Sequence, residues 1–230
     1  MRIIRASTVE ADIVLDPFCG CGTAITVAQR LKRRWLGIDV THLAVNLIKL
    51  RLKDMFSLEP RKDYQVIGEP EDVAGARELA SQNRYQFQWW ALSLINARPY
   101  GDKIKGSDTG IDGYIYFSDQ KDKYKKAVVS VKSGNVSVKD IRDLGHVIER
   151  EKSEIGVLIT LEEATRHMIK EALQKGCYRS ETVGKDYPRL QILTIDDLFA
   201  AKKPRIPGVT SLVKKAPSIY TTPTEDLDLQ

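Results

Sequence analysis

The sequence predicts an α/β protein built in two parts, and three observations lead to this prediction. An apolar run leads into the turn DPFCGCGT at residues 16–23, and a helical pattern follows it. A polar, proline-bearing stretch at residues 57–70 has the composition of a linker. Beyond the middle of the chain, β-prone runs alternate with helical ones. We therefore expect one part over residues 1–56 and a second over residues 71–200.

Composition narrows the classes of function. A chain of 230 residues has room for one or two domains. The formal charge of +5 and the pI near 9.0 are compatible with nucleic-acid contact, although 31 acidic residues against 36 basic ones exclude a polybasic protein. Cys19, Cys21 and Cys177 have no disulfide or metal-binding spacing. We find no signal peptide and no membrane-length apolar run, so a cytoplasmic location is expected.

The first part is expected to contain strands at residues 13–15 and 35–38, with a helix at 23–31 between them. Glycines in the turn after the first strand allow a sharp bend and a close approach of backbone to a ligand. The second strand ends in Asp39, and an acid there can accept hydrogen bonds from two ribose hydroxyls. Together these features predict half of a nucleoside-binding site.

Over roughly residues 8–56 the chain resembles the S-adenosylmethionine motif of DNA methyltransferases that modify adenine N6 or cytosine N4. The resemblance implies a partial Rossmann-like methyltransferase segment. It places Asp16 at the methionine amino group, Phe18 along the cofactor pocket and Asp39 at the ribose. The positions that it assigns to the cofactor are Asp16, Phe18, Gly20, Gly22, Thr23 and Asp39. The alternative is a Gly-rich turn in some other doubly wound unit.

The tetrapeptide Asp/Asn-Pro-Pro-Tyr/Phe, with which these enzymes grip a flipped base, does not occur in the chain. In one permuted class it precedes the cofactor motif, and the short stretch before Asp16 in this chain does not contain it. We therefore expect a methyltransferase tail whose catalytic half lies on a missing segment or on another chain. Methylation by this chain alone is not expected.

The second part is expected to open with one long helix or two over residues 71–97, with one of the adjacent Trp89 and Trp90 packed inward. Strands should follow at 114–117 and 127–132, joined by a charged hairpin tip at 119–126. The later elements are expected at residues 137–152 (helix), 156–160 (strand), 164–175 (helix) and 190–198.

Asp112 and Lys132 should lie on adjacent antiparallel strands, where their side chains can converge. Phosphodiester hydrolysis needs acids that hold a divalent metal and a lysine that stabilises developing charge. Residues 71–200 resemble the Mrr-like branch of the PD-(D/E)xK nucleases, which implies a restriction-endonuclease-like α/β/α domain. By this resemblance Asp112 is a metal-binding acid and Lys132 the catalytic lysine. Glu78, on the preceding helix, is the supporting acid, and the metal would be Mg²⁺.

One position departs from this pattern, because the family has Glu, Asp or Gln two residues before the lysine and this chain has Ser130. A hydroxyl is a poor ligand for Mg²⁺. Two alternatives stay open: an active nuclease in which Glu78 compensates, and a degenerate domain that binds DNA without cutting it. DNA is the expected partner in both. Basic residues in a proline-bearing tail, residues 201–230, would at most contact phosphates loosely.

Overall fold

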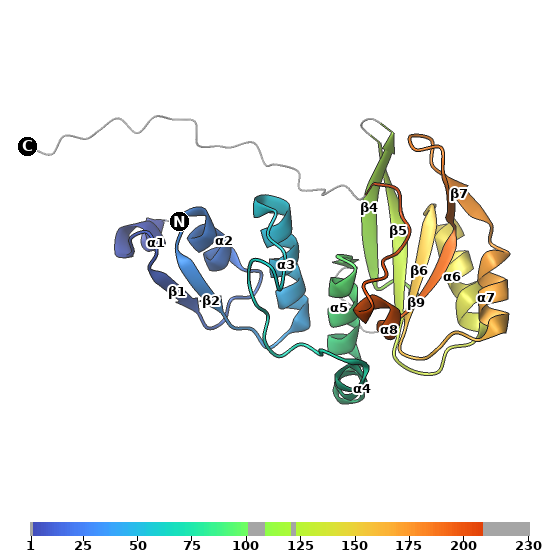
Figure 1. The fold of residues 1–230 in the computed structure, drawn as a ribbon, viewed down its shortest axis with the longest axis horizontal. Helices are drawn as coiled ribbons and strands as arrows, with labels where there is room; N and C mark the ends of the chain where they lie inside the picture. The colour runs from blue at the N-terminus through green and yellow to red at the C-terminus, as the bar shows by residue number, and fades with distance from the viewer. Residues whose placement is uncertain (1, 101–108, 121–122, 209–230) are drawn as a thin grey trace, which may run out of the picture.

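The computed structural model describes residues 2–100, 109–120 and 123–208, and it has the mixed α/β fold that the sequence predicts (Figure 1). A small region with a two-stranded sheet lies at one end of the molecule, and a five-stranded sheet lies at the other. Two basic residues of the tail, Lys214 and Lys215, lie outside the described residues. No helix within the described ranges has the length and apolar character that crossing a bilayer requires.

The small region contains α1 (Arg2–Ser7), β1 (Ile13–Asp16), α2 (Thr23–Arg30), β2 (Arg34–Gly37) and α3 (His42–Phe56). β1 and β2 pair in parallel, with Leu15 opposite Leu36. One face of this pair packs on α2 and α3 through a core that includes Ile25, Ile48 and Leu52. The absence of a side chain at Gly37 lets Ile25 approach, since a Cβ there would lie 2.2 Å from its Cδ1.

Residues 57–72, most of which we expected to be a linker, contain no helix or strand. They nevertheless pack on α3, because Leu58 and Tyr64 join the small core. Glu69 in the same stretch forms an ion pair with Lys49 of α3 at 2.5 Å, and both side chains are mostly buried. The stretch therefore holds the chain close to α3 as it passes from the first region to the second.

The larger region begins with α4 (Val73–Gln82) and α5 (Arg84–Leu94). The helical pattern breaks at Asn83, whose side-chain oxygen accepts hydrogen bonds from the backbone N–H groups of Tyr85 and Gln86 and so caps α5. Trp90 is fully buried, whereas Trp89 is half-buried and lies 6.3 Å from the ring of Tyr85. The expectation of one inward tryptophan is confirmed.

The remaining elements form a mixed sheet in the order β3-β4-β5-β6-β9, with a separate two-stranded hairpin. β3 (Arg98–Pro99), β4 (Gly113–Gln120) and β5 (Lys123–Lys132) are antiparallel, while β6 (Ile155–Thr160) and β9 (Leu190–Thr194) continue in parallel with β5. The other elements are α6 (Val138–Arg150), α7 (Arg166–Leu173), β7 (Cys177–Arg179), β8 (Asp186–Pro188) and α8 (Ile195–Phe199).

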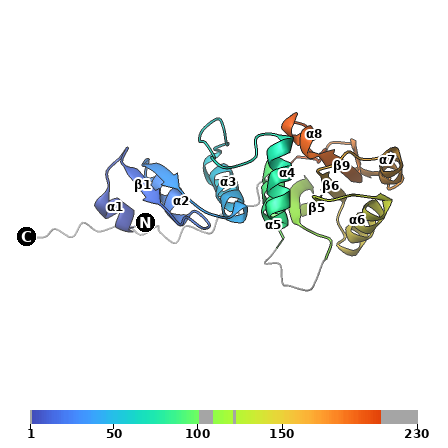
Figure 2. The ribbon, with the colours of Figure 1, turned by 90° about the horizontal axis from the view of Figure 1, so that it is seen from below.

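Helices cover both faces of the five-stranded sheet (Figure 2). On one face, α4, α5 and α8 pack through a core that includes Phe87, Trp90 and Phe117. On the other face, α6 and α7 pack through Ile141, Leu144, Ile148 and Met168. Three layers of this kind are the α/β/α arrangement that we predicted for this part of the chain.

One expectation within this region was wrong. Residues 119–126 were expected to be a charged hairpin tip, but β4 runs to Gln120 and β5 begins at Lys123. Asp119 is 1% exposed, because it follows Ile115 and Phe117 on the inward-facing side of β4. The charge of Asp119 led to the expectation that it is exposed to solvent. The hairpin formed by β7 and β8, which was not predicted, covers it instead.

Candidate cofactor half-site and nuclease-like face

The predicted cofactor residues gather where the two parallel strands end. The loop after β1 meets the end of β2 through two hydrogen bonds: Cys19 N–H donates to the carbonyl of Ile38 at 3.0 Å, and Gly20 N–H donates to Asp39 Oδ2 at 2.9 Å. Carboxyl ends of adjacent parallel strands are where open α/β sheets bind ligands. The structure therefore brings Gly20 and Asp39 together as neighbours.

The two loop glycines lie in different surroundings. Gly22 has a φ of +77°, and a Cβ there would meet Cγ1 of Ile48 at 2.6 Å. Gly20 has a φ of +46°, and a Cβ there would meet no atom within 4 Å. Gly22 is thus required by packing as well as by backbone conformation, whereas Gly20 faces open space.

Asp39 has part of its hydrogen-bonding capacity in use. Its Oδ1 accepts from Thr41 N–H and from Thr41 Oγ1, both at 2.9 Å, and its Oδ2 accepts from Gly20. Burial raises the pKa of Asp39, but the hydrogen bonds from Thr41 and Gly20 outweigh this and hold the pKa below its ordinary value. A carboxylate has about four lone-pair sites. Of these three hydrogen bonds, Oδ1 accepts two and Oδ2 accepts one.

The other predicted cofactor residues line the loop. Asp16 ends β1, and its Oδ1 accepts a hydrogen bond from the backbone of Phe18 at 3.3 Å. The Phe18 side chain is 90% exposed, so nothing in the described residues closes the pocket that it was predicted to line. Thr23 is the first residue of α2 and lies 3.7 Å from the Cys21 sulfur.

The outer face of the β1–β2 pair is apolar and open. Four aliphatic side chains on this face are at least half-exposed: Ile13, Leu15, Leu36 and Ile38. Parallel strands are ordinarily covered on both faces. This half-site is therefore open on the side away from α2 and α3.

The residues of the predicted nuclease site do not all lie on one face of the larger sheet. Ser130 and Lys132 lie on the side of β5 that carries Val128, which packs under α6. The register of β4 and β5 places Asp112, just before β4, across from Ser130. The convergence of Asp112 and Lys132 stays a prediction, because Asp112 lies outside β4 and its carboxylate bonds to the backbone of β5.

Backbone contacts engage Asp112. Its Oδ2 accepts a hydrogen bond from Val131 N–H at 2.7 Å, and its own N–H donates to Val129 at 2.9 Å. The carboxylate thus continues the β4–β5 ladder past the end of β4. The Lys132 amine makes no hydrogen bond or ion pair with another described residue.

Glu78 does not join these two residues. It is exposed on α4, and its Oε1 accepts a hydrogen bond from Gln82 at 3.0 Å. α4 packs through Ala76 and Ala80 on the opposite face of the sheet from Lys132. Across residues 2–100, 109–120 and 123–208, no group of three His, Cys, Asp or Glu side chains is arranged to hold a metal ion.

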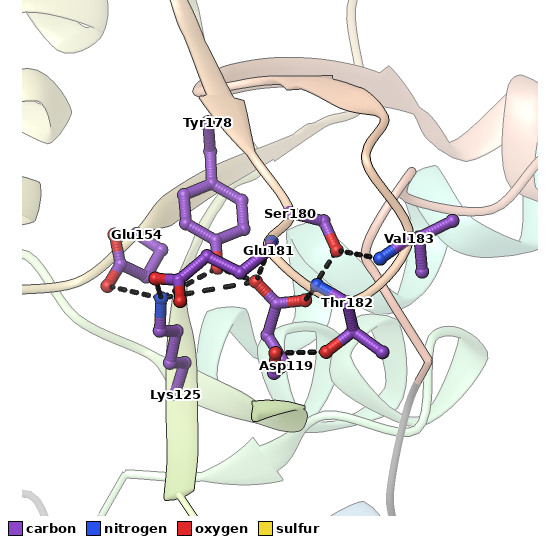
Figure 3. Close-up of polar contacts among 8 residues, drawn as sticks. All are labelled: Asp119, Lys125, Glu154, Tyr178, Ser180, Glu181, Thr182 and Val183. Atoms are coloured by element: carbon purple, nitrogen blue, oxygen red, sulfur yellow. Dashed lines mark hydrogen bonds and ion pairs between the residues drawn. The ribbon is translucent and has the colours of Figure 1, made fainter. Parts of the chain in front are cut away.

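A polar cluster that the sequence analysis missed surrounds Asp119 (Figure 3). Its carboxylate accepts hydrogen bonds from Tyr178 Oη and Ser180 Oγ, and from the backbone N–H groups of Glu181 and Thr182 at 3.0 and 3.3 Å. Burial raises the pKa of Asp119, but these hydrogen bonds hold it at about 2. The alternation of Ile115, Phe117 and Asp119 along β4 was the available sequence signal.

Lys125 completes this cluster. Its amine lies 2.8 Å from Tyr178 Oη and within 4.0 Å of the carboxylates of Asp119, Glu154 and Glu181. The hydrogen-bond donors to the Asp119 carboxylate all belong to the β7–β8 hairpin, whereas Asp119 and Lys125 belong to β4 and β5. The cluster therefore ties one hairpin to the other.

Comparisons with protein families match both parts of the chain. Residues 1–50 match the DNA methylase family model, and residues 86–199 match the model of the NACHT-associated inactive restriction endonuclease 1. The methyltransferase and restriction-endonuclease resemblances are thus confirmed. The assignment to the Mrr-like branch stays a prediction.

Among curated proteins, the chain is 50% identical over 52 residues to the type II methyltransferase M2.DpnII of Streptococcus pneumoniae, covering 23% of this chain and 19% of that protein. It is 45% identical over 97 residues to M.HpaI of Haemophilus parainfluenzae, covering 42% and 31%. The chain thus spans less than a third of each of these relatives.

Among solved structures, it resembles the MspJI restriction endonuclease in complex with a 27-mer oligonucleotide. The TM-score is 0.39, with 16% identity over 63% of this chain and 34% of that chain.

Proposed function

Since the chain joins part of an N6/N4 DNA methylase to a restriction-endonuclease-like domain, we propose that it acts in DNA modification and restriction. In this proposal the first region supplies the cofactor half of a methyltransferase, and the second region binds DNA without cutting it. The observation that carries the first half is the meeting of Gly20 and Asp39 at the ends of two parallel strands.

The residues present fit one side of S-adenosylmethionine. Asp39 retains acceptor capacity for a ribose hydroxyl, and Gly20 leaves the space beside the loop free of a side chain. Asp16 stands at the end of β1, where it would receive the methionine amino group. When bound, S-adenosylmethionine supplies the methyl group, while these residues only hold and orient it.

We further propose that a catalytic half, carrying the base-gripping tetrapeptide, covers the open apolar face of β1 and β2. Ile13, Leu15, Leu36 and Ile38 give this face the character of an interior. Burial of aliphatic side chains that are half-exposed in the isolated chain would favour association. The occupant can be another segment of a longer polypeptide or a separate chain.

Calorimetry with S-adenosylmethionine tests this proposal. We expect the chain alone to bind weakly or not at all. Added to a methylase catalytic half, it should bind with a Kd on the order of micromolar, and Asp16→Ala and Asp39→Ala should each weaken that binding. Micromolar binding by the chain alone, or methyl transfer to mixed-sequence DNA by the chain alone, would contradict the half-site argument.

Three features support a domain that binds DNA without cutting it. Ser130 replaces the carboxylate of the nuclease pattern, the Asp112 carboxylate is engaged with Val131, and Glu78 lies across the sheet. The Lys132 amine is available for a phosphate, and Lys139 is exposed at the start of α6 on the same side. The alternative is a Mg²⁺-dependent nuclease, favoured by the contact of Asp112 with β5, the strand that ends at Lys132.

A DNA assay with and without Mg²⁺ or Mn²⁺ separates these alternatives. We expect salt-dependent binding and no cleavage, with Lys132→Ala weakening binding and reducing the salt slope by about 1. Metal-dependent cleavage that is lost in both Asp112→Ala and Lys132→Ala would establish the nuclease instead. In that case Ser130→Glu should raise cutting by restoring a ligand, whereas Glu78→Ala should leave it unchanged, because Glu78 lies across the sheet.

A further inference from the structure

α3 of the methylase segment and α5 of the restriction-endonuclease-like domain are joined by a seam of polar contacts. Three hydrogen bonds follow one another along the two helices. They join His42 to Gln86, Asn46 to the carbonyl of Trp89, and Lys49 to Ser93. Beyond α5, Asp54 meets Arg98 at 3.1 Å. The partners are separated by 43 or 44 residues at every step, so the two helices run parallel in one register.

This seam is largely shielded from water. Asn46 is 1% exposed, and its amide nitrogen also contacts the carbonyl of Ala97 at 3.4 Å. Lys49 is 8% exposed and is paired with Glu69. Buried polar groups of this kind carry a penalty when they lose their partners, so the seam favours one relative position of the two helices.

The first contact of the seam reaches the cofactor half-site. Gln86 Oε1 accepts a hydrogen bond from His42 N–H at 2.7 Å, and Gln86 Nε2 donates to the carbonyl of Val40 at 3.4 Å. His42 is the first residue of α3, where backbone N–H groups have no partner inside the helix. The Gln86 side chain, which comes from the other domain, therefore bonds to the first N–H of α3 and to the residues before and after Thr41.

Thr41 in turn holds Asp39. Its N–H and its hydroxyl both donate to Asp39 Oδ1, and Asp39 Oδ2 accepts from Gly20. Hydrogen bonds on either side of the backbone of residues 40–42 thus connect α5 to the two predicted cofactor loops. We propose that Gln86 is a positioning residue of the cofactor half-site, so that the restriction-endonuclease-like domain fixes the loop that would receive the ribose.

This inference rests on the proposed function for its meaning, but amide hydrogen exchange on the full chain tests it without any cofactor. In Gln86→Leu, the amides of Gly20, Thr41 and His42 should exchange about 3- to 10-fold faster, the range that one lost hydrogen bond of ordinary strength produces. Amides of the β1–β2 ladder should be unchanged. Gln86→Glu keeps an acceptor for His42 N–H and should restore most of the protection.

Gln82→Leu is the matched control, since Gln82 is an exposed glutamine of α4 whose side chain bonds to Glu78. Equal exchange of the two loops in wild type and Gln86→Leu would overturn the inference. So would faster exchange throughout α3 and α5 that Gln86→Glu does not rescue, because that pattern means a general loss of packing. The exchange result can be as expected while the chain, combined with a methylase catalytic half into a completed enzyme, binds no S-adenosylmethionine. That outcome would contradict only the proposed function.

Where the completed enzyme does bind the cofactor, Gln86→Leu should weaken that binding by a similar factor, while Gln82→Leu leaves it unchanged. Unchanged affinity in Gln86→Leu would overturn the positioning role.

Discussion

Two glycines two residues apart in one loop serve different purposes. Gly22 is confined by Ile48, which comes from α3, whereas the space beside Gly20 is open. Both adopt positive φ, which residues with a Cβ adopt at a cost. The loop therefore has one position that the fold requires and one that a ligand would require.

We predict that Gly22→Ala lowers the free energy of unfolding by roughly 1–3 kcal/mol from backbone strain, plus a further loss from overlap with Ile48. Gly20→Ala should carry the strain alone and be measurably less destabilised. Urea unfolding of the two variants provides the comparison. Equal losses in both would mean that Ile48 moves aside freely.

Asp119 and Lys125 join the β4–β5 hairpin to the β7–β8 hairpin (Figure 3). The buried carboxylate satisfies two hydroxyls and two backbone N–H groups of the second hairpin. Hydrogen bonds to a buried charged acceptor are stronger than those between neutral groups. We call this contact between the two hairpins, centred on Asp119 and Lys125, the clamp.

The clamp should respond to acid. The pKa of Asp119 is about 2 in the folded protein, below its usual 3.8. The ionised carboxylate therefore stabilises the fold fully above the unfolded pKa, and this stabilisation is lost as the pH falls through about 2. We predict that Asp119→Asn loses about 2 kcal/mol at pH 7 and also loses this part of the pH dependence.

Unfolding measured from pH 7 to pH 2 tests this prediction. Asp186→Asn is the control, because Asp186 is an exposed acid of β8 that pairs with Arg179 at 3.4 Å. It should stay close to wild type. An Asp119→Asn variant with the stability and acid response of wild type would show that the clamp contributes nothing.

At the scale of the whole molecule, the two regions differ in how complete they are. The larger sheet is covered on both faces by helices (Figure 2). The β1–β2 pair is covered on one face only, and Leu15 and Leu36 stand opposite each other on the open face. The two sheets thus differ in how much of their apolar surface is covered.

We predict that Leu15→Lys combined with Leu36→Glu abolishes association with a methylase catalytic half. The chain's own stability should change by no more than about 0.5 kcal/mol, because both side chains are more than half-exposed. Sedimentation of the mixture measures the association. Ile169→Lys, at an exposed apolar position on α7, is the control and should associate normally. Normal association of the double variant would place the partner elsewhere.

The sequence by itself determined several of the elements and both family resemblances, because these depend on local pattern. The turn at residues 16–23, the capped helix α6 after Ser137 and the buried strand β6 were all predictable from spacing and side-chain type. Strand alternation also placed Ser130 and Lys132 on one face.

Only the tertiary structure decided which distant residues meet. Glu78 lies across the sheet from Lys132 because α4 packs its alanines on the other face, a choice that no local pattern records. Asp119 is buried by a hairpin some sixty residues later in the chain, and Gln86 reaches the Asp39 loop through the register of two helices. Side-chain periodicity fixes the face of an element, but the packing of elements far apart in the sequence decides what that face contacts.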